Sequence, residues 1–398
     1  MTDIHDFDDI RPYTKEELPE VYDKLLADPS FKNALSMVYK DVPYEAIAQT
    51  IRSCGTALEL QKRCVYPALK KLIKEASAGM STDFSAIESE RDLSHTFISN
   101  HRDIVLDSAF LCCALIENDM NTVEIAIGDN LLIHPWIKDF VRVNKSFIVQ
   151  RALTMRQMLA ASAKMSRYIH YAVNEKDENI WIAQREGRAK DSDDRTQESV
   201  LKMLAMGGEG SVISRLKHLN IVPLSISYEY DPCDYLKAME FQNKRDIPGF
   251  KKSKQDDLDN MQTGIFGYKG RIHYHAAPCI NDWLDTLDPD MPKTELFTAV
   301  AAHIDHEIHS SYMLYAGNYV AADNLVESYP EESNARHYTM PRPFASHYTE
   351  EERERFDAYI EKRIGMIDLP NKDEKYLRKQ ILLMYANPVF NNEAAGNK

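Results

Sequence analysis

Between about residues 94 and 275, short apolar runs alternate with longer helical stretches, and this alternation constrains the fold more than any other feature of the chain. Strands are expected at 95–99, 123–127, 146–150, 179–183, 221–228 and 270–275. Helices are expected between them, at roughly 105–117, 131–142, 153–165, 195–206 and 210–217. Strands that alternate with helices build a sheet covered by helices, so the pattern predicts an α/β layer architecture.

Helices are expected on both sides of this α/β region. Before it, residues 15–76 repeat apolar residues at helical spacing after a capping box formed by Thr14 and Glu17. After it, helices are expected at 293–315, 349–365 and 372–385. The predicted organisation is an N-terminal helical segment at 1–90, an α/β domain at 91–290 and a C-terminal helical extension at 291–398.

The composition excludes several classes of protein. A net charge of −14 is unfavourable for a protein that wraps nucleic acid, because phosphate contacts need a basic surface, so no nucleic-acid partner is expected. No apolar run approaches the roughly 18 residues that a membrane-spanning helix requires. The six cysteines form no CxxC pair and the first residues are polar and acidic, which together predict a cytoplasmic protein with reduced thiols.

Basic residues are nevertheless concentrated in two places, at 138–167 and at 244–254. Confined basic patches on an acidic protein suit a small anionic substrate or an anionic membrane surface. Because the second patch is rich in lysine, we expect it to mediate peripheral contact with the inner face of a membrane. Such contact should be weakened by salt.

Among the residues that can carry chemistry, His101 is the first candidate because it directly follows the first apolar run of the α/β region. Asp107 follows six residues later, and Asp103 lies between them. An imidazole at the end of a strand, with a carboxylate that holds its tautomer, can deprotonate an alcohol near neutral pH. Either carboxylate is a candidate partner. The alternative interpretation is a surface histidine beside the acidic start of a helix.

Three more segments lie at the ends of predicted strands, at 145–151, 184–190 and 221–226. The first ends in Arg151, whose guanidinium suits bidentate phosphate binding. The second places Gly187 in a charged turn, where a backbone amide can approach a ligand. The third is an apolar strand interrupted by Pro223, which indicates an edge or a bulge. Each segment alone also fits an ordinary strand end or turn.

In this order, the four segments resemble the four sequence blocks of the glycerophospholipid acyltransferase family, whose members acylate glycerol 3-phosphate, lysophosphatidic acid and related lipids. Asn100 and His101, with Asp107, resemble the Asn-His-x4-Asp block, with one additional residue before the aspartate. The resemblance covers about residues 95–290 and includes neither helical end.

The other three blocks are matched in part. Segment 147–151 resembles the Gly-x-Ile-Phe-Ile-Asp-Arg block, with Lys145 where glycine is usual. Segment 184–188 resembles the Phe-Pro-Glu-Gly-Thr-Arg block, but lacks the Phe-Pro pair and one residue before its arginine. Segment 222–224 resembles the closing proline block.

The resemblance implies a glycerolipid O-acyltransferase built on a mixed sheet flanked by helices. His101 would be the general base, and the family pattern favours Asp107 over Asp103 as its partner. Acyl-CoA or acyl-carrier protein would be the acyl-donating co-substrate, with no metal, no further cofactor and no covalent acyl-enzyme. The residues implied in binding substrate are Lys145, Arg151, Glu186, Gly187 and Arg188. Arg151, with Arg188 or Lys145, would hold the phosphate of a glycerol or lysolipid acceptor, and the Glu186-Gly187 turn would face the oxyanion.

A rival interpretation comes from the helix expected at 293–315. His306 and His309 share one of its faces, and His303 lies one turn earlier. These histidines are the basis for the alternative function, a non-enzymatic membrane-peripheral binding protein with a metal site on this helix. The simpler explanation is a polar stripe beside the apolar face of the helix.

Overall fold

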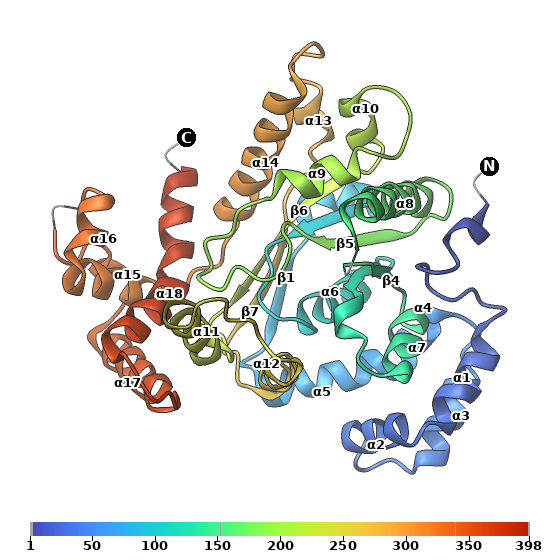
Figure 1. Ribbon diagram of the computed structural model, residues 1–398, viewed down its shortest axis with the longest axis horizontal. Helices are drawn as coiled ribbons and strands as arrows, with labels where there is room; N and C mark the ends of the chain where they lie inside the picture. The colour runs from blue at the N-terminus through green and yellow to red at the C-terminus, as the bar shows by residue number, and fades with distance from the viewer. Residues whose placement is uncertain (1–2, 152, 339, 397–398) are drawn as a thin grey trace.

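The computed structural model describes residues 3–151, 153–338 and 340–396, and these residues are organised around one seven-stranded sheet (Figure 1). The strands are β1 (Met80–Asp83), β2 (Thr96–Ser99), β3 (Val123–Gly128), β4 (Ser146–Val149), β5 (Asn179–Ala183), β6 (Ile221–Tyr228) and β7 (Ile272–Ala276). Their order across the sheet is β1-β7-β6-β2-β5-β3-β4. The strands from β6 to β4 run parallel, whereas β7 is antiparallel to β6 and parallel to β1. The expected α/β architecture with a mixed sheet is therefore confirmed.

Helices occupy most of the remaining chain. Those of the N-terminal segment are α1 (Leu18–Ala27), α2 (Pro29–Val38), α3 (Tyr44–Arg52), α4 (Ala57–Leu60) and α5 (Tyr66–Ala76). Those of the α/β region are α6 (Leu106–Glu117), α7 (Pro135–Val143), α8 (Met155–Asn174), α9 (Glu198–Leu204), α10 (Val212–Lys217), α11 (Asp234–Asp246), α12 (Lys254–Phe266) and α13 (Asn281–Leu284). Those of the C-terminal extension are α14 (Lys293–Ser310), α15 (Ala316–Ser328), α16 (Pro330–Ala335), α17 (Glu350–Gly365) and α18 (Glu374–Gly396). In the part of the chain that the structure describes, none of these helices is both long and apolar enough to cross a membrane.

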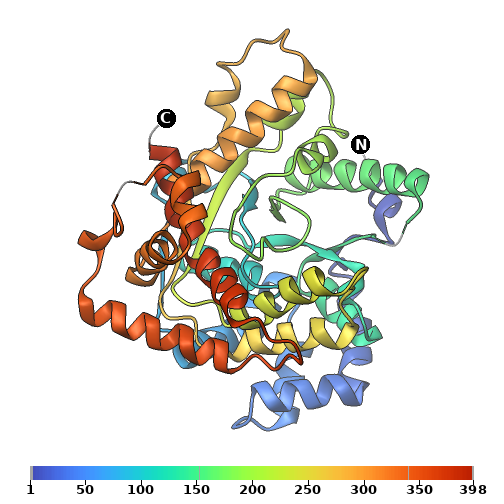
Figure 2. The same ribbon diagram turned by 60° about the vertical axis from the view of Figure 1, so that its left-hand side comes forward.

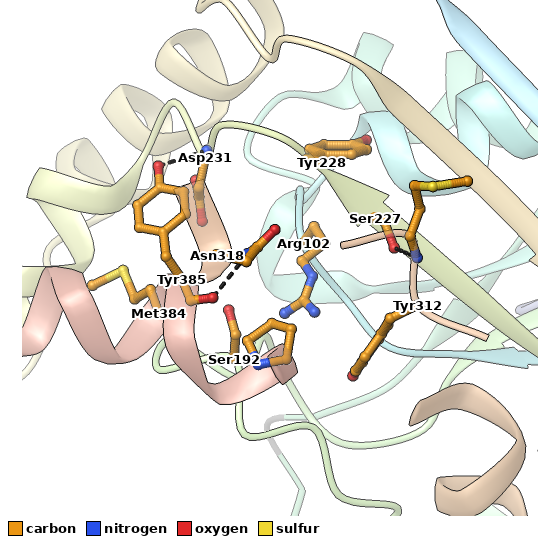
Figure 3. A pocket seen from close by; sticks show the side chains of 11 residues that line it. Arg102, Ser192, Ser227, Tyr228, Asp231, Tyr312, Asn318, Met384 and Tyr385 are labelled. Carbon is orange, nitrogen blue, oxygen red and sulfur yellow. Dashed lines mark hydrogen bonds between the residues drawn. The ribbon is translucent and has the colours of Figure 1, made fainter. Parts of the chain in front are cut away.

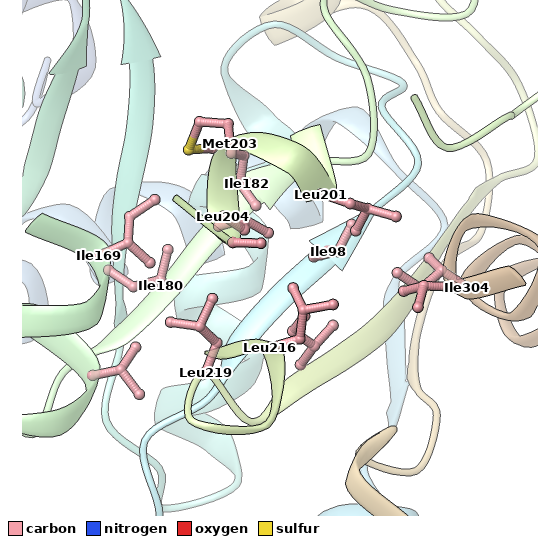
Figure 4. Packing of buried hydrophobic residues seen from close by; sticks show 14 of the residues in the cluster. Ile98, Ile169, Ile180, Ile182, Leu201, Met203, Leu204, Leu216, Leu219 and Ile304 are labelled. Atoms are coloured by element: carbon pink, nitrogen blue, oxygen red, sulfur yellow. The ribbon is translucent and has the colours of Figure 1, made fainter. Parts of the chain in front are cut away.

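Both faces of the sheet are covered, because successive residues of a strand point to opposite sides. On one face, β2, β4, β5 and β6 pack against α8, α9, α10 and α14. Figure 4 shows part of this cluster, including Ile98, Ile169, Ile182, Leu204 and Ile304. On the other face, Phe97 of β2 and Trp181 of β5 pack in a second cluster with α5 and α6. Burial on both faces explains why apolar residues predominate in β3, β5 and β6.

The direction of the strands decides where functional side chains meet. The strands β2, β3, β4, β5 and β6 are parallel, so the segments that follow them emerge at one edge of the sheet, here called the carboxyl edge. His101 follows β2, Arg151 follows β4 and the 184–190 segment follows β5. All three expected blocks that carry candidate chemistry therefore end at the same edge.

The C-terminal helices pack directly onto the α/β region (Figures 1 and 2). The helices α15, α17 and α18 share one hydrophobic cluster with residues of α11. A buried carboxylate, Asp234 of α11, strengthens this contact by accepting hydrogen bonds from the hydroxyls of Tyr359 and Tyr385 at 2.7 and 2.8 Å. It also pairs with Arg363 of α17. The extension is thus joined to the α/β region by apolar packing and by a buried polar network.

Candidate active site

His101 and Asp107 form a hydrogen-bonded pair at the carboxyl edge. The Nδ1 atom of His101 lies 2.8 Å from Oδ2 of Asp107. The Asp107 side chain is fully buried in the first turn of α6, whereas 14% of the His101 side chain is exposed. When Nδ1–H donates to the carboxylate, Nε2 is left as an acceptor, and Nε2 makes no hydrogen bond to any described residue. The imidazole is therefore oriented by the hydrogen bond at Nδ1, while Nε2 is available to a substrate.

The additional residue between His101 and Asp107 lies in a non-helical loop, since α6 begins only at Leu106. The loop turns around the Asp107 carboxylate: the backbone N–H groups of Arg102 and Asp103 donate to Oδ2 at 2.6 and 3.0 Å. The hydroxyl of Tyr228 donates to Oδ1 at 3.1 Å. Asp107 is thus fixed by three donors besides His101, and the longer spacing does not prevent the pair from forming.

Asp103, the other candidate partner of His101, instead forms hydrogen bonds with the backbone at the start of α6. Its Oδ1 accepts hydrogen bonds from the backbone N–H groups of Val105 and Leu106, at 2.9 and 2.8 Å, at the start of α6. It makes no hydrogen bond to His101 within the described residues. Burial, with the nearby Asp107 charge, raises the pKa of Asp103. Asp103 is therefore a helix-capping residue, and Asp107 is the partner of the histidine.

Two neighbours hold the end of β2 in place. Asn100 bridges to β6: its Nδ2 donates to the carbonyl of Ile226, and its Oδ1 accepts from the Ile226 N–H, at 2.9 and 2.8 Å. The ring of Trp181, on β5, meets the His101 ring edge-to-face with centroids 5.7 Å apart. Since Asn100 precedes the histidine and Trp181 contacts its ring, both restrict where the imidazole can point.

Arg102, directly after the histidine, enters a buried ion pair. Its Nη2 lies 2.7 Å from Oδ2 of Asp194, and both side chains are buried. Asp194 also accepts from the Tyr312 hydroxyl at 2.5 Å, and its backbone carbonyl accepts from Nε2 of His309 at 2.7 Å. Arg102 and Tyr312 line a small cavity, shown in Figure 3. Residues beyond position 300 therefore fix both the loop after β5 and the residue next to His101.

A larger cavity, of about 310 Å³, lies at the carboxyl edge beside β3, β4 and β5. Its polar wall includes Gln150, Arg151, Arg185, Glu186 and Gln197. Its apolar wall includes Ile10, Ile148, Met158, Met165, Ile182 and Met203. Ala183 also lines it and is in register with Ser99 of β2, two residues before His101. The cavity thus reaches the strand next to β2, although His101 itself does not line it.

The second and third blocks meet at this cavity. The Nη1 atom of Arg151 lies 3.3 Å from Oε1 of Glu186, and both side chains remain exposed, Arg151 by 39%. Gly187 follows in the left-handed backbone region with φ +67°, which glycine adopts without strain. The structure therefore brings together three of the predicted site residues: Arg151, Glu186 and Gly187.

Arg188 turns away from Arg151. Its Nη2 donates to Oδ1 of Asn260 on α12 at 3.1 Å, while its Nη1 is buried with no hydrogen-bond partner among the described residues. The Arg188 charge opposes the rise in the pKa of Asp103, which places the guanidinium near the loop that follows β2. Arg188 therefore lies on the His101 side of the third block and not in the cavity.

Lys145 does not lie at the carboxyl edge with the other predicted site residues. It directly precedes β4, so it lies at the edge of the sheet opposite to the carboxyl edge. Its Nζ contacts Oε2 of Glu178 at 2.5 Å and the carbonyl of Thr122 at 3.0 Å. The expectation that Lys145 holds an acceptor phosphate beside Arg151 is wrong, because the length of β4 separates the two side chains.

Arg185 was not among the residues expected from the sequence. It lines the cavity with Arg151, and its Nε is buried without a hydrogen-bond partner in the described residues. The sequence feature that could have identified Arg185 is its position directly before Glu186, at the end of a predicted strand. A cation at that position reaches the carboxyl edge as Arg151 does.

Two of the α14 histidines make contacts within the fold. The His303 ring stacks on Trp283 with centroids 4.0 Å apart, and His309 donates to the Asp194 carbonyl. Within residues 3–151, 153–338 and 340–396, no group of three His, Cys, Asp or Glu side chains is placed to share a metal ion. His303 and His309 therefore contribute to packing and hydrogen bonding within the fold.

His303 should make stability depend on pH. Burial lowers the pKa of His303 to about 4 from an ordinary 6.5. Between these values the unfolded chain binds a proton that the native chain does not, so the free energy of unfolding falls as pH drops from 6.5 towards 4. We expect His303→Gln to lessen this fall, as measured by urea unfolding at several pH values. The exposed His218→Gln is the control, and an unchanged pH slope in His303→Gln would contradict the assignment.

Comparisons with known proteins assign no family to the chain. No protein-family model matches it, and no curated protein sequence matches it. The function is therefore inferred from the geometry of the carboxyl edge together with the resemblance of the four segments.

Proposed function

We propose that this protein is an acyltransferase that moves a fatty acyl group from acyl-CoA or acyl-carrier protein to a hydroxyl of glycerol 3-phosphate, lysophosphatidic acid or a related lipid acceptor. The observation that carries the proposal is the His101–Asp107 pair, with Nδ1 held at 2.8 Å and Nε2 open. A buried carboxylate behind a partly exposed imidazole is an arrangement that supports general-base catalysis. We predict that the activity is cytoplasmic and serves phospholipid biosynthesis.

The proposed reaction begins with proton transfer from the acceptor hydroxyl to Nε2 of His101. The resulting oxygen nucleophile attacks the thioester carbonyl and forms the new C–O bond. Collapse of the tetrahedral intermediate breaks the C–S bond, and the thiolate leaves with the proton from Nε2. Asp107 stabilises the imidazolium between these two proton transfers, because it is held ready by its own hydrogen bonds.

The 310 Å³ cavity supports a phosphorylated lipid as the acceptor. Arg151 and Arg185 supply cations at its polar wall, which suits a phosphate. Apolar side chains from α8 and α9 also line the cavity, which suits hydrocarbon. The cavity reaches β5, the strand next to β2, and an acceptor bound there is proposed to extend from the cavity towards His101.

An acceptor panel tests the proposal. The purified protein is incubated with palmitoyl-CoA and, separately, glycerol 3-phosphate, dihydroxyacetone phosphate, lysophosphatidic acid or glycerol, and thiol release is followed with a chromogenic reagent. We expect release that depends on a phosphorylated acceptor and is far slower with glycerol. Absence of acceptor-dependent release with both acyl-CoA and acyl-carrier protein donors would contradict the proposal.

The two aspartates near His101 should respond differently to substitution. Asp107→Asn preserves shape but removes the charge that stabilises the imidazolium, so we expect kcat to fall by about 10²-fold or more. Asp103→Asn keeps a good capping side chain, so we expect kcat to stay within about ten-fold of wild type. Both rates are measured by thiol release, with thermal unfolding as a check on the fold. Equal losses in the two variants would contradict the assignment of Asp107 as the partner.

A further inference from the structure

Helix α8, with the residues just before it, carries a net charge opposite to that of the whole chain. Residues 151–174 contain four basic residues and no Asp or Glu, although the chain has 62 acidic and 48 basic residues. Arg156 and Arg167 are exposed and form no ion pair with a described residue. The other two are paired, Lys164 with Asp9 at 2.5 Å and Arg151 with Glu186 at 3.3 Å. This surface is therefore positive on a protein that is otherwise acidic.

The same end of α8 exposes large apolar side chains. Met155, Leu159 and Met158 are 87%, 65% and 50% exposed. Their spacing places them on one side of the helix, and every residue from 154 to 160 is exposed. In Figure 2, α8 is the green helix that extends to the right-hand side of the molecule. Adjacent apolar side chains of this size, exposed beside basic residues, indicate a surface that binds a partner.

This helix end is formed before any partner arrives. Thr154 and Gln157 build a capping box, in which the Gln157 N–H donates to the Thr154 hydroxyl and the Thr154 N–H donates to Oε1 of Gln157. Such a cap stabilises the first turn without help from tertiary packing. An amphipathic end that is already helical has less conformational entropy to lose on binding.

The position of α8 connects this surface with the site. Because α8 follows β4, its first turn lies at the carboxyl edge, where His101 also lies. Met158 lines the 310 Å³ cavity together with Arg151. The exposed apolar side chains therefore continue into the apolar wall of the cavity.

Three of the five cations in the basic patch at 244–254, which the sequence suggested as the membrane contact, have acidic partners, while Lys251 and Lys254 are exposed and form no ion pair with a described residue. Nζ of Lys244 lies 2.9 Å from Oε1 of Glu240, and Nζ of Lys252 lies 2.9 Å from Oδ1 of Asp257. Arg245 pairs with Asp373 of the C-terminal extension at 2.8 Å. These cations already have acidic partners, whereas Arg156 has none among the described residues.

We propose that the exposed end of α8 docks onto an anionic lipid bilayer, with Met155 and Leu159 entering the interface and Arg156 facing the head groups. The bilayer fits this surface because basic charge and apolar side chains occur together on a projecting helix end. The inference deepens the proposed function: docking through α8 would open the cavity towards the membrane from which a lipid acceptor comes.

Vesicle flotation of the full chain tests the docking. Wild-type protein is mixed with vesicles of phosphatidylglycerol and phosphatidylcholine, or of phosphatidylcholine alone, at low and high salt. We expect binding to the anionic vesicles only, weakened by salt, and at least about ten-fold weaker in M155E/L159E. The control M37E/V38E adds the same charge at exposed apolar positions on α2, where Met37 is 71% exposed, and should bind as wild type does.

Further measurements separate the docking from the catalytic proposal. Leu159→Trp should shift its fluorescence to shorter wavelength when anionic vesicles are added. Transfer from a short-chain acyl-CoA to glycerol 3-phosphate in solution should be unchanged in M155E/L159E. Binding of M155E/L159E as tight as that of wild type, or no binding of wild type to anionic vesicles, would overturn the docking alone. If M155E/L159E keeps vesicle binding but loses transfer from acyl-carrier protein, the bilayer docking is overturned, and the exposed end of α8 binds an acidic protein instead.

Discussion

Replacing His101 with alanine is expected to lower kcat/KM for acyl transfer by about 10³-fold or more while the fold stays intact. The imidazole supplies the one open nitrogen of the His101–Asp107 pair, and alanine removes it altogether. The fold should tolerate the change because the side chain is partly exposed and Asp107 keeps three other donors. The measurement is the initial rate of acceptor-dependent thiol release, accompanied by circular dichroism and thermal unfolding.

The chain contains a matched control for this substitution. His275 on β7 also lies near an aspartate, with Nδ1 3.6 Å from Oδ2 of Asp83, but it lies on the far side of β6 from β2. His275→Ala should therefore retain nearly wild-type activity. Comparable loss in His275→Ala, or substantial activity in a folded His101→Ala, would contradict the role assigned to His101.

Replacing Asp194 with alanine is expected to give the largest loss of stability, about 3–5 kcal/mol in the free energy of unfolding. The reason is that Arg102 stays buried without its partner, while the Tyr312 hydroxyl also loses its acceptor. Activity should fall as well, because the backbone N–H of Arg102 holds the Asp107 carboxylate at 2.6 Å. Urea unfolding of the purified variant measures the change in stability.

The neighbouring residue provides the control. Asp193 pairs with Arg195, but both side chains are about half exposed, so Asp193→Ala should cost at most about 1 kcal/mol. A difference between the two variants isolates the buried pair from a general effect of changing this loop. Equal free energies of unfolding in Asp194→Ala and Asp193→Ala would show that the buried network contributes little.

Local patterns in the sequence were sufficient for the central strands and for His101, whereas the preference for Asp107 over Asp103 came from the family resemblance. The strands β2 and β5 are buried on both faces, so their apolar runs were easy to locate. His101 and Asp107 are close in sequence, and the loop between them adjusts to one additional residue. The contact between Arg151 and Glu186 was not predicted, although both residues follow predicted strands that end at the same edge.

Features that depend on contacts between distant segments could not be predicted. The short edge strand β1 has a polar sequence and exists because it pairs with β7, about 190 residues away. The contacts of Asp194 with His309 and Tyr312 join the loop after β5 to the end of α14 and the segment after it, more than 100 residues later. Lys145 was misplaced because the resemblance assigned it a position in a block, while the direction of β4 carries it to the opposite edge.

The most direct test of the central claim is to follow isotope-labelled glycerol 3-phosphate with palmitoyl-CoA by mass spectrometry, using wild-type protein and His101→Ala side by side. The proposed chemistry predicts that wild type converts the labelled acceptor into its palmitoyl ester, with one thiol released for each ester formed, and that His101→Ala forms neither at a comparable rate. If wild type releases the thiol without forming a labelled ester from this acceptor or from labelled lysophosphatidic acid, the protein hydrolyses thioesters and the acyltransferase proposal is contradicted.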